Sequence, residues 1–363
     1  MEVKGMNICF YSPYIPKHFG GGEKHLFDTA IAAATKHSVT IALPSDSDAE
    51  AVKEQYQTFL GTSLSQLTFV SSPLAKGTIL TKIAWTAQFD VIYYVTDGSF
   101  FFTGSKKRLA HIQIPFSQTK TSLIERLKLT HWKYKNTNSA FTKKVIEKSW
   151  NTSVQDIHYP MVILPKRVSE RKQKVILSVG RFFTHLHAKR QDVVVQNFRK
   201  LCERFPKESK GWKLVLVGNV ENQQFFDEVV AMSKGLQVEI YPNATTKELT
   251  QWYKDAQIYW HAAGFGVDES KNPENVEHFG ITTLEAMSYG VVPVVHKKGG
   301  QPEVLGEKLS TYLWNSPEEC IAITAQLLRQ PILMHSVASL ARQRAKHFGE
   351  EAFVKRVLHF FEL

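Results

Sequence analysis

Residues 277–295 read Glu277-His-Phe-Gly-Ile-Thr-Thr-Leu-Glu285-Ala-Met-Ser-Tyr-Gly-Val-Val-Pro-Val-Val295. Two carboxylates stand eight residues apart in this stretch, and an apolar run typical of a buried strand follows them. Gly280 permits a tight entry into a helix, and Thr282 precedes Glu285 by the three residues of a capping box. The first amides of such a helix lack internal partners and attract phosphate. The stretch predicts either a helix N-terminus that holds a diphosphate or an ordinary capped helix beside a solvated acid.

Apolar runs of strand length alternate with helical patterns on both sides of this stretch. The predicted strands cover 7–11, 38–43, 67–70, 90–95 and 109–114, and then 175–179, 213–217, 238–241, 258–261 and 291–295. The predicted helices include 23–35, 49–60, 191–204, 222–234, 246–255 and 283–289. Continuous apolar strands separated by helices indicate parallel sheets covered on both faces. We therefore predict an α/β protein with two Rossmann-like, doubly wound domains.

The predicted boundary between the two domains is marked by two prolines and a basic stretch. Tyr159-Pro-Met-Val-Ile-Leu-Pro165 precedes the basic residues 166–174, a composition typical of a linker. We expect domains over 1–164 and 165–347, followed by a last helix within 348–363. Ligands of such sheets lie beyond the carboxyl ends of the strands, so we expect the two domains to face a central cleft.

The length and the cysteine content limit the class of protein. The chain has 363 residues, enough for two domains of ordinary size. Its cysteines, Cys9, Cys202 and Cys320, are scattered and form no disulfide framework, as expected in a reducing compartment. The start has no signal-peptide layout, and no run approaches the roughly 20 apolar residues of a membrane helix. We expect a soluble or peripheral cytoplasmic protein.

The net charge of +11 is concentrated in one part of the chain. Between residues 104 and 150, two acids, Glu125 and Glu147, face eleven basic residues: Lys106, Lys107, Arg108, Lys120, Arg126, Lys128, Lys133, Lys135, Lys143, Lys144 and Lys148. Such a segment attracts a membrane surface, a charged acceptor or nucleic acid. Residues 122–132 mix apolar and basic side chains and end in a tryptophan, as an interfacial helix does. A merely solvated basic face fits the same pattern.

The stretch 277–295 resembles the E-x7-E signature of the retaining GT-B glycosyltransferases, glycosyltransferase family 4. Further segments resemble motifs of that family in the expected order: Gly20-Gly-Gly-Glu23, Ser178-Val-Gly-Arg181 with Lys189-Arg-Gln-Asp192, Leu216-Val-Gly218 and Gly299-Gly300-Gln-Pro-Glu303. The resemblance runs from about residue 7 to 303. Two departures exist, because Arg190 stands where the family often has glycine and the segment 182–188 is longer than in some members.

The resemblance implies an activity. It implies a hexosyltransferase that moves a sugar from a UDP-, GDP- or ADP-linked donor to a glycan or lipid-linked acceptor, with retention of anomeric configuration. It also implies the GT-B fold, with the last helix packed on the first domain. Together with the basic segment 104–150, it favours an enzyme of cell-surface polysaccharide biosynthesis, peripheral at the inner membrane face. We expect no metal and no other cofactor.

The resemblance also assigns roles to residues of the second domain. Glu285 is expected to bind the ribose hydroxyls, and Glu277 the hydroxyls of the donor sugar. The backbone amides of Ile281, Thr282 and Thr283, after Gly280, are expected to hold phosphate. Arg181 and Lys189 are expected to clamp the diphosphate in place of a metal ion, since cations aimed at developing charge stabilise a leaving group.

In the first domain the candidates are a glycine turn and a histidine. Gly21 and Gly22 follow the first predicted strand, where glycine allows close approach of the backbone to phosphate or acceptor. His111 lies late in a predicted strand and matches a family histidine near the donor sugar, although a buried core histidine fits the same position. Asp97 is a further candidate after the strand 90–95.

Two patterns that suggest a metal are better explained otherwise. Asp46-Ser-Asp48 matches the Asp-x-Asp motif of metal-dependent transferases, but it lies in a Ser/Asp loop typical of a turn and helix cap. His185-Leu-His187 has no further ligands at a suitable spacing.

Other functions remain as alternatives. A glycosyl phosphorylase or a nucleotide-sugar epimerase could use the same fold. A nucleic-acid-binding protein would explain the basic segment, but the sequence lacks a recognition module with interleaved aromatic residues, and we expect no nucleic-acid partner. An NAD-dependent enzyme would need a G-x-G-x-x-G turn that is not in the right place.

Overall fold

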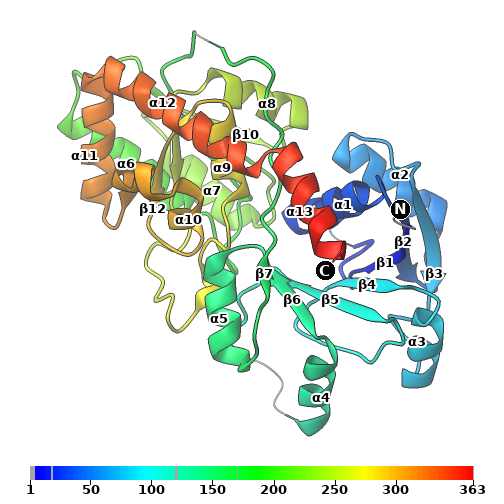
Figure 1. The fold of residues 1–363 in the computed structure, drawn as a ribbon. Coiled ribbons are helices and arrows are strands. Elements are labelled where there is room, and N and C mark those ends of the chain that lie inside the picture. The colour runs from blue at the N-terminus through cyan, green and yellow to red at the C-terminus, as the bar shows by residue number, and fades with distance from the viewer. Residues whose placement is uncertain (1–4, 18, 119–121, 170, 363) are drawn as a thin grey trace. The chain divides into compact units, whose positions relative to one another are not determined.

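The computed structural model describes residues 5–17, 19–118, 122–169 and 171–362 of the chain (Figure 1). Lys120 of the basic segment therefore lies outside the described residues. The chain divides into two compact units. Unit 1 holds Met1–Met161 together with Glu350–Leu363, and unit 2 holds Val162–Gly349.

Unit 1 is built on a parallel sheet of seven described strands in the order β3-β2-β1-β4-β5-β6-β7. The strands are β1 (Asn7–Tyr11), β2 (Ser38–Pro44), β3 (Leu67–Ser72), β4 (Val91–Val95), β5 (Lys107–Ile112), β6 (Tyr134–Thr137) and β7 (Asp156–Ile157). The helices are α1 (Gly21–Ala33), α2 (Ala49–Leu60), α3 (Ile79–Thr86), α4 (Leu123–His131), α5 (Ala140–Trp150) and α13 (Glu350–Glu362). The predicted strand 109–114 is thus shifted by two residues, because Lys107 pairs with Val91 at the start of β5.

Unit 2 repeats the scheme with six described strands in the order β10-β9-β8-β11-β12-β13. They are β8 (Val175–Val179), β9 (Lys213–Gly218), β10 (Val238–Pro242), β11 (Ile258–His261), β12 (Val292–His296) and β13 (Leu313–Trp314). The helices are α6 (Gln191–Arg204), α7 (Gln223–Met232), α8 (Thr246–Asp255), α9 (Ile281–Ser288), α10 (Gln301–Leu305), α11 (Pro317–Arg329) and α12 (Pro331–Ala345). Short 3-10 turns cover Pro273–Asn275, Glu307–Tyr312 and Lys346–Phe348.

The two sheets confirm the predicted α/β class and its Rossmann-like halves. In each sheet the strand order reverses beside the first strand, at β1 and β4 in unit 1 and at β8 and β11 in unit 2. Such a switch point leaves a crevice at the carboxyl ends of the strands, where ligands bind. In unit 2 this edge receives the turn after β8, the end of β11 and the start of α9.

The last helix completes the core of unit 1. Phe353, Val357, Phe360 and Phe361 of α13 are buried in the same apolar cluster as Phe10 and other residues of the first strands. The Lys107 ammonium donates to the carbonyl oxygens of Phe360 and Phe361, at 3.3 and 3.1 Å, and so satisfies the helix C-terminus.

The junctions between the units lie close to the expected positions, with small shifts that have a physical reason. The expected boundary after residue 164 lies instead between Met161 and Val162. The Val162 amide donates to the carbonyl oxygen of Phe348 at 2.9 Å, and the ring of Phe348 packs on Phe279. These contacts assign both ends of the second segment to unit 2. No helix within the described residues is long and apolar enough to span a bilayer.

Candidate active site

Helix α9 begins directly after Gly280, two residues earlier than its apolar pattern predicts. Gly280 is the N-cap, with φ +112°, a conformation that residues with a side chain rarely adopt. A Cβ at this position would also lie 2.9 Å from Nε2 of Gln301. Because the cap is a glycine, no side chain occupies the amides of Ile281 and Thr282 from that position.

The capping box expected from Thr282 and Glu285 is wrong, because both residues lie inside the helix. The Tyr259 hydroxyl donates to Oγ1 of Thr282 at 2.7 Å, and the Tyr253 hydroxyl donates to Oε2 of Glu285 at 2.9 Å. The two tyrosines come from β11 and α8, so the hydroxyl and the carboxylate of α9 are oriented by neighbouring elements. Burial, followed by the charge of Glu285, raises the pKa of Tyr253 well above its ordinary value and keeps the phenol a donor.

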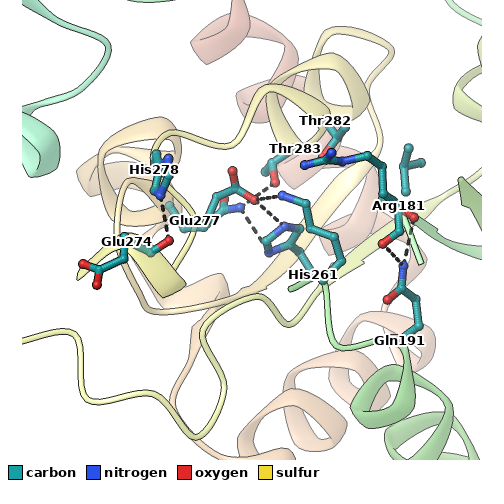
Figure 2. A network of polar contacts seen from close by, with 12 residues as sticks. Arg181, Gln191, His261, Glu274, Glu277, His278, Thr282 and Thr283 are labelled. Atoms are coloured by element: carbon teal, nitrogen blue, oxygen red, sulfur yellow. Dashed lines mark hydrogen bonds and ion pairs between the residues drawn. The ribbon is translucent and has the colours of Figure 1, made fainter. Parts of the chain in front are cut away.

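Glu277 lies at the centre of a buried polar network beside this helix (Figure 2). Its Oε2 is 2.6 Å from Nζ of Lys189 and 2.8 Å from Nε2 of His261. The Gln301 amide lies 3.3 Å from Nδ1 of His261 and donates to Oγ1 of Thr283 at 3.0 Å. An amide nitrogen only donates, so Nδ1 of His261 accepts and its Nε2, which lies 2.8 Å from the Glu277 carboxylate, carries the hydrogen.

Electrostatics agree with this assignment. Burial lowers the pKa of His261, which keeps the ring neutral, as the donor role toward Glu277 requires. Burial alone would raise the pKa of Glu277, but the charge of Lys189 and the bond from His261 overcome it and hold that pKa well below the usual range. Glu277 is therefore a buried carboxylate that is paired with a cation and hydrogen-bonded.

Lys189 and Arg181 occupy different environments. The Lys189 stem packs against Gly180, where a Cβ would lie 2.4 Å from its Cγ. The side chain of Arg181 is 44% exposed; its Nη1 is 2.9 Å from Oε1 of Glu221, and its guanidinium lies over the ring of Phe183. In this conformation Lys189 belongs to the buried network, and Arg181 forms an exposed ion pair on the same edge of the sheet.

The turn that carries Arg181 is fixed by two neighbouring elements. The Gln191 amide, at the start of α6, donates to the carbonyl oxygens of Gly180 and Arg181 at 2.9 and 3.1 Å. Gly218, at the end of β9, lies so close that a Cβ there would be 1.9 Å from the carbonyl oxygen of Gly180. Gly218 ends the Leu216-Val-Gly218 motif, whereas Gln191 was not among the predicted site residues, although it directly follows Lys189-Arg190.

Arg190 replaces the glycine expected at its position and compensates for the backbone conformation. It is the N-cap of α6 and has φ +55°, which is in the left-handed region. Its guanidinium bonds the Asp192 carboxylate at 2.9 Å and the carbonyl oxygen of Phe265 at 2.6 Å. The left-handed conformation costs about 1–2 kcal/mol. The side chain offsets this by tying α6 to the loop that follows β11.

His261 and Gln301 are functional candidates that sequence reasoning missed. Residue 261 ends a strand that the sequence does predict, and Gln301 opens the Gln-Pro-Glu303 motif without an assigned role. A polar residue at the carboxyl end of a buried strand is the signal that could have identified His261. The sequence does not show that these two side chains pair with Glu277 and Thr283. The pairing appears only in the folded structure.

In unit 1 the predicted histidine lies in the core. His111 is fully buried, bonds Asn136 through Nδ1 at 2.7 Å and packs against His25, with ring centroids 4.6 Å apart. Burial lowers its pKa to about 4, so the ring is neutral. A side chain without exposed surface does not touch a substrate in this conformation, and we leave His111 out of the proposed machinery.

The glycine turn contacts Gln113, a residue that follows β5. Gly20 is the N-cap of α1, and its amide donates to Oε2 of Glu23 at 3.0 Å. Gly21 and Gly22 form the first turn of this helix. The Gln113 amide donates to the carbonyl oxygen of Gly22 at 3.1 Å. The polar side chain delivered to this turn is thus Gln113, two residues beyond His111.

The patterns that resembled metal sites have structural partners. Asp48 caps α2, accepting from the amides of Glu50 and Ala51 at 3.1 and 3.2 Å, as the turn-and-cap interpretation predicts. Asp46 pairs with Lys76 at 2.9 Å. Among the described residues, no group of three or more His, Cys, Asp or Glu side chains is arranged to hold a metal ion.

Similarity to known proteins covers the same parts of the chain. A sequence model of the family described as glycosyl transferases group 1 matches residues 163–344, which contain the whole network around α9. A curated relative from Neurospora crassa, GDP-Man:Man(3)GlcNAc(2)-PP-Dol alpha-1,2-mannosyltransferase, is 25% identical over 264 residues. That match covers 62% of this chain and 44% of the relative. The chain spans less than half the length of the curated relatives it matches.

Solved structures share the fold over nearly the whole chain. Anabaena Alr3699/HepE in complex with UDP and glucose has a TM-score of 0.69 at 14% identity, covering 98% of this chain and 99% of that one. A glycosyltransferase from Rickettsia africae has a TM-score of 0.71 at 13% identity, covering 99% and 98%. The likeness confirms the predicted GT-B fold. With half of its length matched by the family model, the chain belongs to the glycosyl transferases group 1.

Proposed function

We propose that this chain is a hexosyltransferase that moves a sugar from a nucleotide-sugar donor to a glycan or lipid-linked acceptor, with retention and without a metal. One observation carries the proposal. The Lys189–Glu277–His261 network places an ionised carboxylate and a cation beside the glycine-capped start of α9. Membership of the family supports the same conclusion.

The start of α9 would bind the diphosphate of the donor. The amides of Ile281, Thr282 and Thr283 lie in the first turn, where the helix dipole favours negative charge. As the bond to the sugar breaks, the negative charge on the diphosphate grows. Fixed donors aimed at that charge lower the barrier, typically by more than any other single contribution.

Lys189 and Arg181 would supply the positive charge that a metal supplies in other transferases. An ammonium group has three N–H donors, so Lys189 can keep its bond to Glu277 and still donate to phosphate. The Arg181–Glu221 pair is nearly half exposed on both sides, and such pairs contribute only about 0–1 kcal/mol. Exchanging Glu221 for a diphosphate, which carries two negative charges, is therefore favourable for Arg181.

The two carboxylates would hold the two ends of the donor. Glu277 remains ionised and is positioned by Lys189 and His261, which suits it to accept hydrogen bonds from sugar hydroxyls. Glu285, oriented by Tyr253, would accept from the ribose hydroxyls. The proposed reaction uses no protein nucleophile. The departing phosphate takes the proton of the acceptor hydroxyl.

The choice of donor and acceptor follows from the relatives. The curated relatives are named for GDP-mannose and a dolichol-linked glycan. GDP-mannose is therefore the first donor to test, followed by other GDP-, UDP- and ADP-sugars. We propose a lipid-linked glycan as the acceptor class and an anionic membrane surface as its setting.

A thermal-shift screen against nucleotide sugars tests the donor site. Bound donor raises the melting temperature by mass action, equivalent to about 2.7 kcal/mol at a hundredfold excess over Kd. The Arg181→Ala variant, which removes a half-exposed side chain, and the Glu285→Ala variant should keep the fold and lose about a hundredfold or more of the turnover. If no nucleotide sugar shifts the melting temperature, the assignment fails.

Three further measurements test the details. Turnover in EDTA should equal turnover in magnesium, and the product should keep the anomeric configuration of the donor sugar. Release of nucleoside diphosphate should require acceptor. An epimerase would convert the donor without acceptor, and a phosphorylase would require inorganic phosphate.

A further inference from the structure

Helices α3 and α4 of unit 1 expose a group of large aliphatic side chains. The exposed fractions are 51% for Ile79, 78% for Leu80, 75% for Leu123, 46% for Ile124 and 51% for Leu127. Single exposed apolar residues need no explanation, but several on neighbouring elements mark an interaction surface. We call these five residues, with the cations Lys82, Arg126, Lys128 and Lys133 on and beside the same helices, the α3–α4 surface.

The two helices are held in place by the same connection between β4 and β5. At the end of α3, Oγ1 of Thr86 accepts from the amide of Gly104 at 2.8 Å. At the end of α4, Nε1 of Trp132 donates to the carbonyl oxygen of Phe101 at 2.8 Å. Figure 1 shows both helices on the same side of unit 1, beneath β4 and β5 in that view. The exposed aliphatic residues therefore sit on anchored helices.

Positive charge surrounds the aliphatic residues. Segments 76–87 and 122–134 contain five Lys/Arg residues and one acid, Glu125. That acid is paired with Lys128 at 2.7 Å. Nζ of Lys82 on α3 lies 5.7 Å from the ring centroid of Phe101, and that ring packs on Trp132 at the end of α4, with centroids 5.2 Å apart. The charge that remains on this surface is cationic.

The residue composition of this surface indicates the kind of partner that it binds. The cores of protein interfaces are enriched in Tyr, Trp and Arg and depleted in Lys. Aliphatic residues bordered by lysine and arginine are instead typical of helices that lie in the interface of an anionic bilayer. We propose that the α3–α4 surface docks unit 1 on an anionic lipid bilayer, with Leu80 and Leu123 inserted and the cations at the headgroups.

A pocket of unit 1 lies beside this surface. Its suggested role, to receive the head of the acceptor, rests on the proposed function. The pocket has a volume of about 690 Å³ and is lined by Lys82 of α3, Phe101 of the β4–β5 connection, Tyr11, Tyr94 and Asp97. The rings of Tyr11 and Tyr94 stack with centroids 5.5 Å apart. Aromatic faces and charged groups suit the polar head of a lipid-linked acceptor. A bilayer on the α3–α4 surface would hold that head at the pocket.

Vesicle flotation of the full chain tests the proposal. The protein should float with vesicles of phosphatidylcholine and phosphatidylglycerol, much less with phosphatidylcholine alone, and less as salt is raised. Replacing both Leu80 and Leu123 with Gln should lower the partition coefficient about tenfold or more. Lys133→Gln should lower it about fivefold. These side chains are exposed, so the fold should not change.

Matched variants in unit 2 provide the controls. Ile332→Gln removes an aliphatic side chain that is 85% exposed on α12, and Lys247→Gln removes an exposed lysine of α8. Neither should change flotation. Absence of flotation, equal flotation of all variants, or a dimer in sedimentation velocity that the Leu80/Leu123 variant abolishes would overturn the proposal.

The same preparations separate this inference from the proposed function. A donor-induced thermal shift reports on unit 2 without lipid. An intact shift without flotation rejects only the docking surface. Flotation without any donor-induced shift rejects the glycosyltransferase assignment and leaves the docking surface standing.

Discussion

Glu277 is a carboxylate that unit 2 keeps ionised in its interior, and the reason lies in single contacts. Both its cationic partner and its hydrogen-bond donor share the same oxygen, Oε2. The side chains of Lys189 and Glu277 are 14% and 11% exposed, so neither charged group is well hydrated. Breaking a buried pair by removing one partner costs about 3–5 kcal/mol, because the other charge remains buried.

The Glu277→Gln variant should therefore lose both stability and turnover. We expect the free energy of unfolding of unit 2 to fall by about 3–5 kcal/mol. In the double variant Lys189→Met/Glu277→Gln the stranded charge is gone, so most of that loss should be recovered while turnover stays lost. Urea denaturation of the wild type, both single variants and the double variant measures the coupling. A single-variant loss below about 1 kcal/mol would contradict a buried pair.

In the proposed function, helix α9 would turn these contacts into a donor site, and its N-cap, Gly280, would decide whether it can. Gly280→Ala would place a side chain on a backbone with φ +112° and push it into Gln301, which holds His261 and Thr283. We expect the donor-induced thermal shift to disappear in this variant. Gly290→Ala is the matched control, because its φ is +67° and the nearest atom is 3.7 Å away. Loss of binding in both variants would indicate general backbone strain.

In unit 1, helices α1 and α13 enclose three neutral histidines, which predicts a response to acid. The ring of His25 lies 4.6 Å from that of His111 and 4.5 Å from that of His158. Burial lowers the pKa of His111 to about 4 and lowers the pKa values of the other two well below the ordinary 6.5. The unfolded chain binds protons near pH 6.5. Between pH 6.5 and 4 it therefore binds more protons than the folded unit.

The free energy of unfolding of unit 1 should accordingly be fully present above pH 6.5 and fall as the pH drops toward 4. Each histidine contributes a slope of up to about 1.4 kcal/mol per pH unit. His25→Leu should reduce the slope at little cost, since both ring nitrogens of His25 lack hydrogen-bond partners among the described residues. Hydrogen exchange of α1 and α13 peptides at several pH values measures the effect. An unchanged slope in His25→Leu would contradict it.

At the scale of the whole molecule, the sequence could predict the elements whose pattern lies in contiguous residues. The strands β8, β9 and β12 are long apolar runs, and α9 lies within one quoted motif. The polar strand β6 (Tyr134–Thr137) and the two-residue strands β7 and β13 carry no such pattern, because the neighbouring strand defines them. The contacts of His261 with Glu277 and with Gln301 likewise join residues 16 and 40 positions apart.

The return of α13 to unit 1 is a whole-molecule feature that leads to a last prediction. A chain that ends at Gly349 lacks four buried side chains of the unit 1 core: Phe353, Val357, Phe360 and Phe361. Each large buried side chain contributes about 2–5 kcal/mol, and domains are stable by only about 5–15 kcal/mol in total. Unit 1 should unfold in the shortened chain. Every residue of the α9 network lies within Val162–Gly349, so unit 2 should remain folded.

Limited proteolysis distinguishes the two units in the shortened chain. Cleavage sites should spread through residues 5–161, while a fragment covering 162–349 stays protected and still melts at a higher temperature with nucleoside diphosphate. A chain carrying only Glu350→Gln, at the exposed start of α13, is the control and should behave as the wild type. Protection of both units after the truncation would mean that α13 adds little to unit 1. Loss of both would mean that unit 2 depends on unit 1 for its stability, which the separate cores argue against.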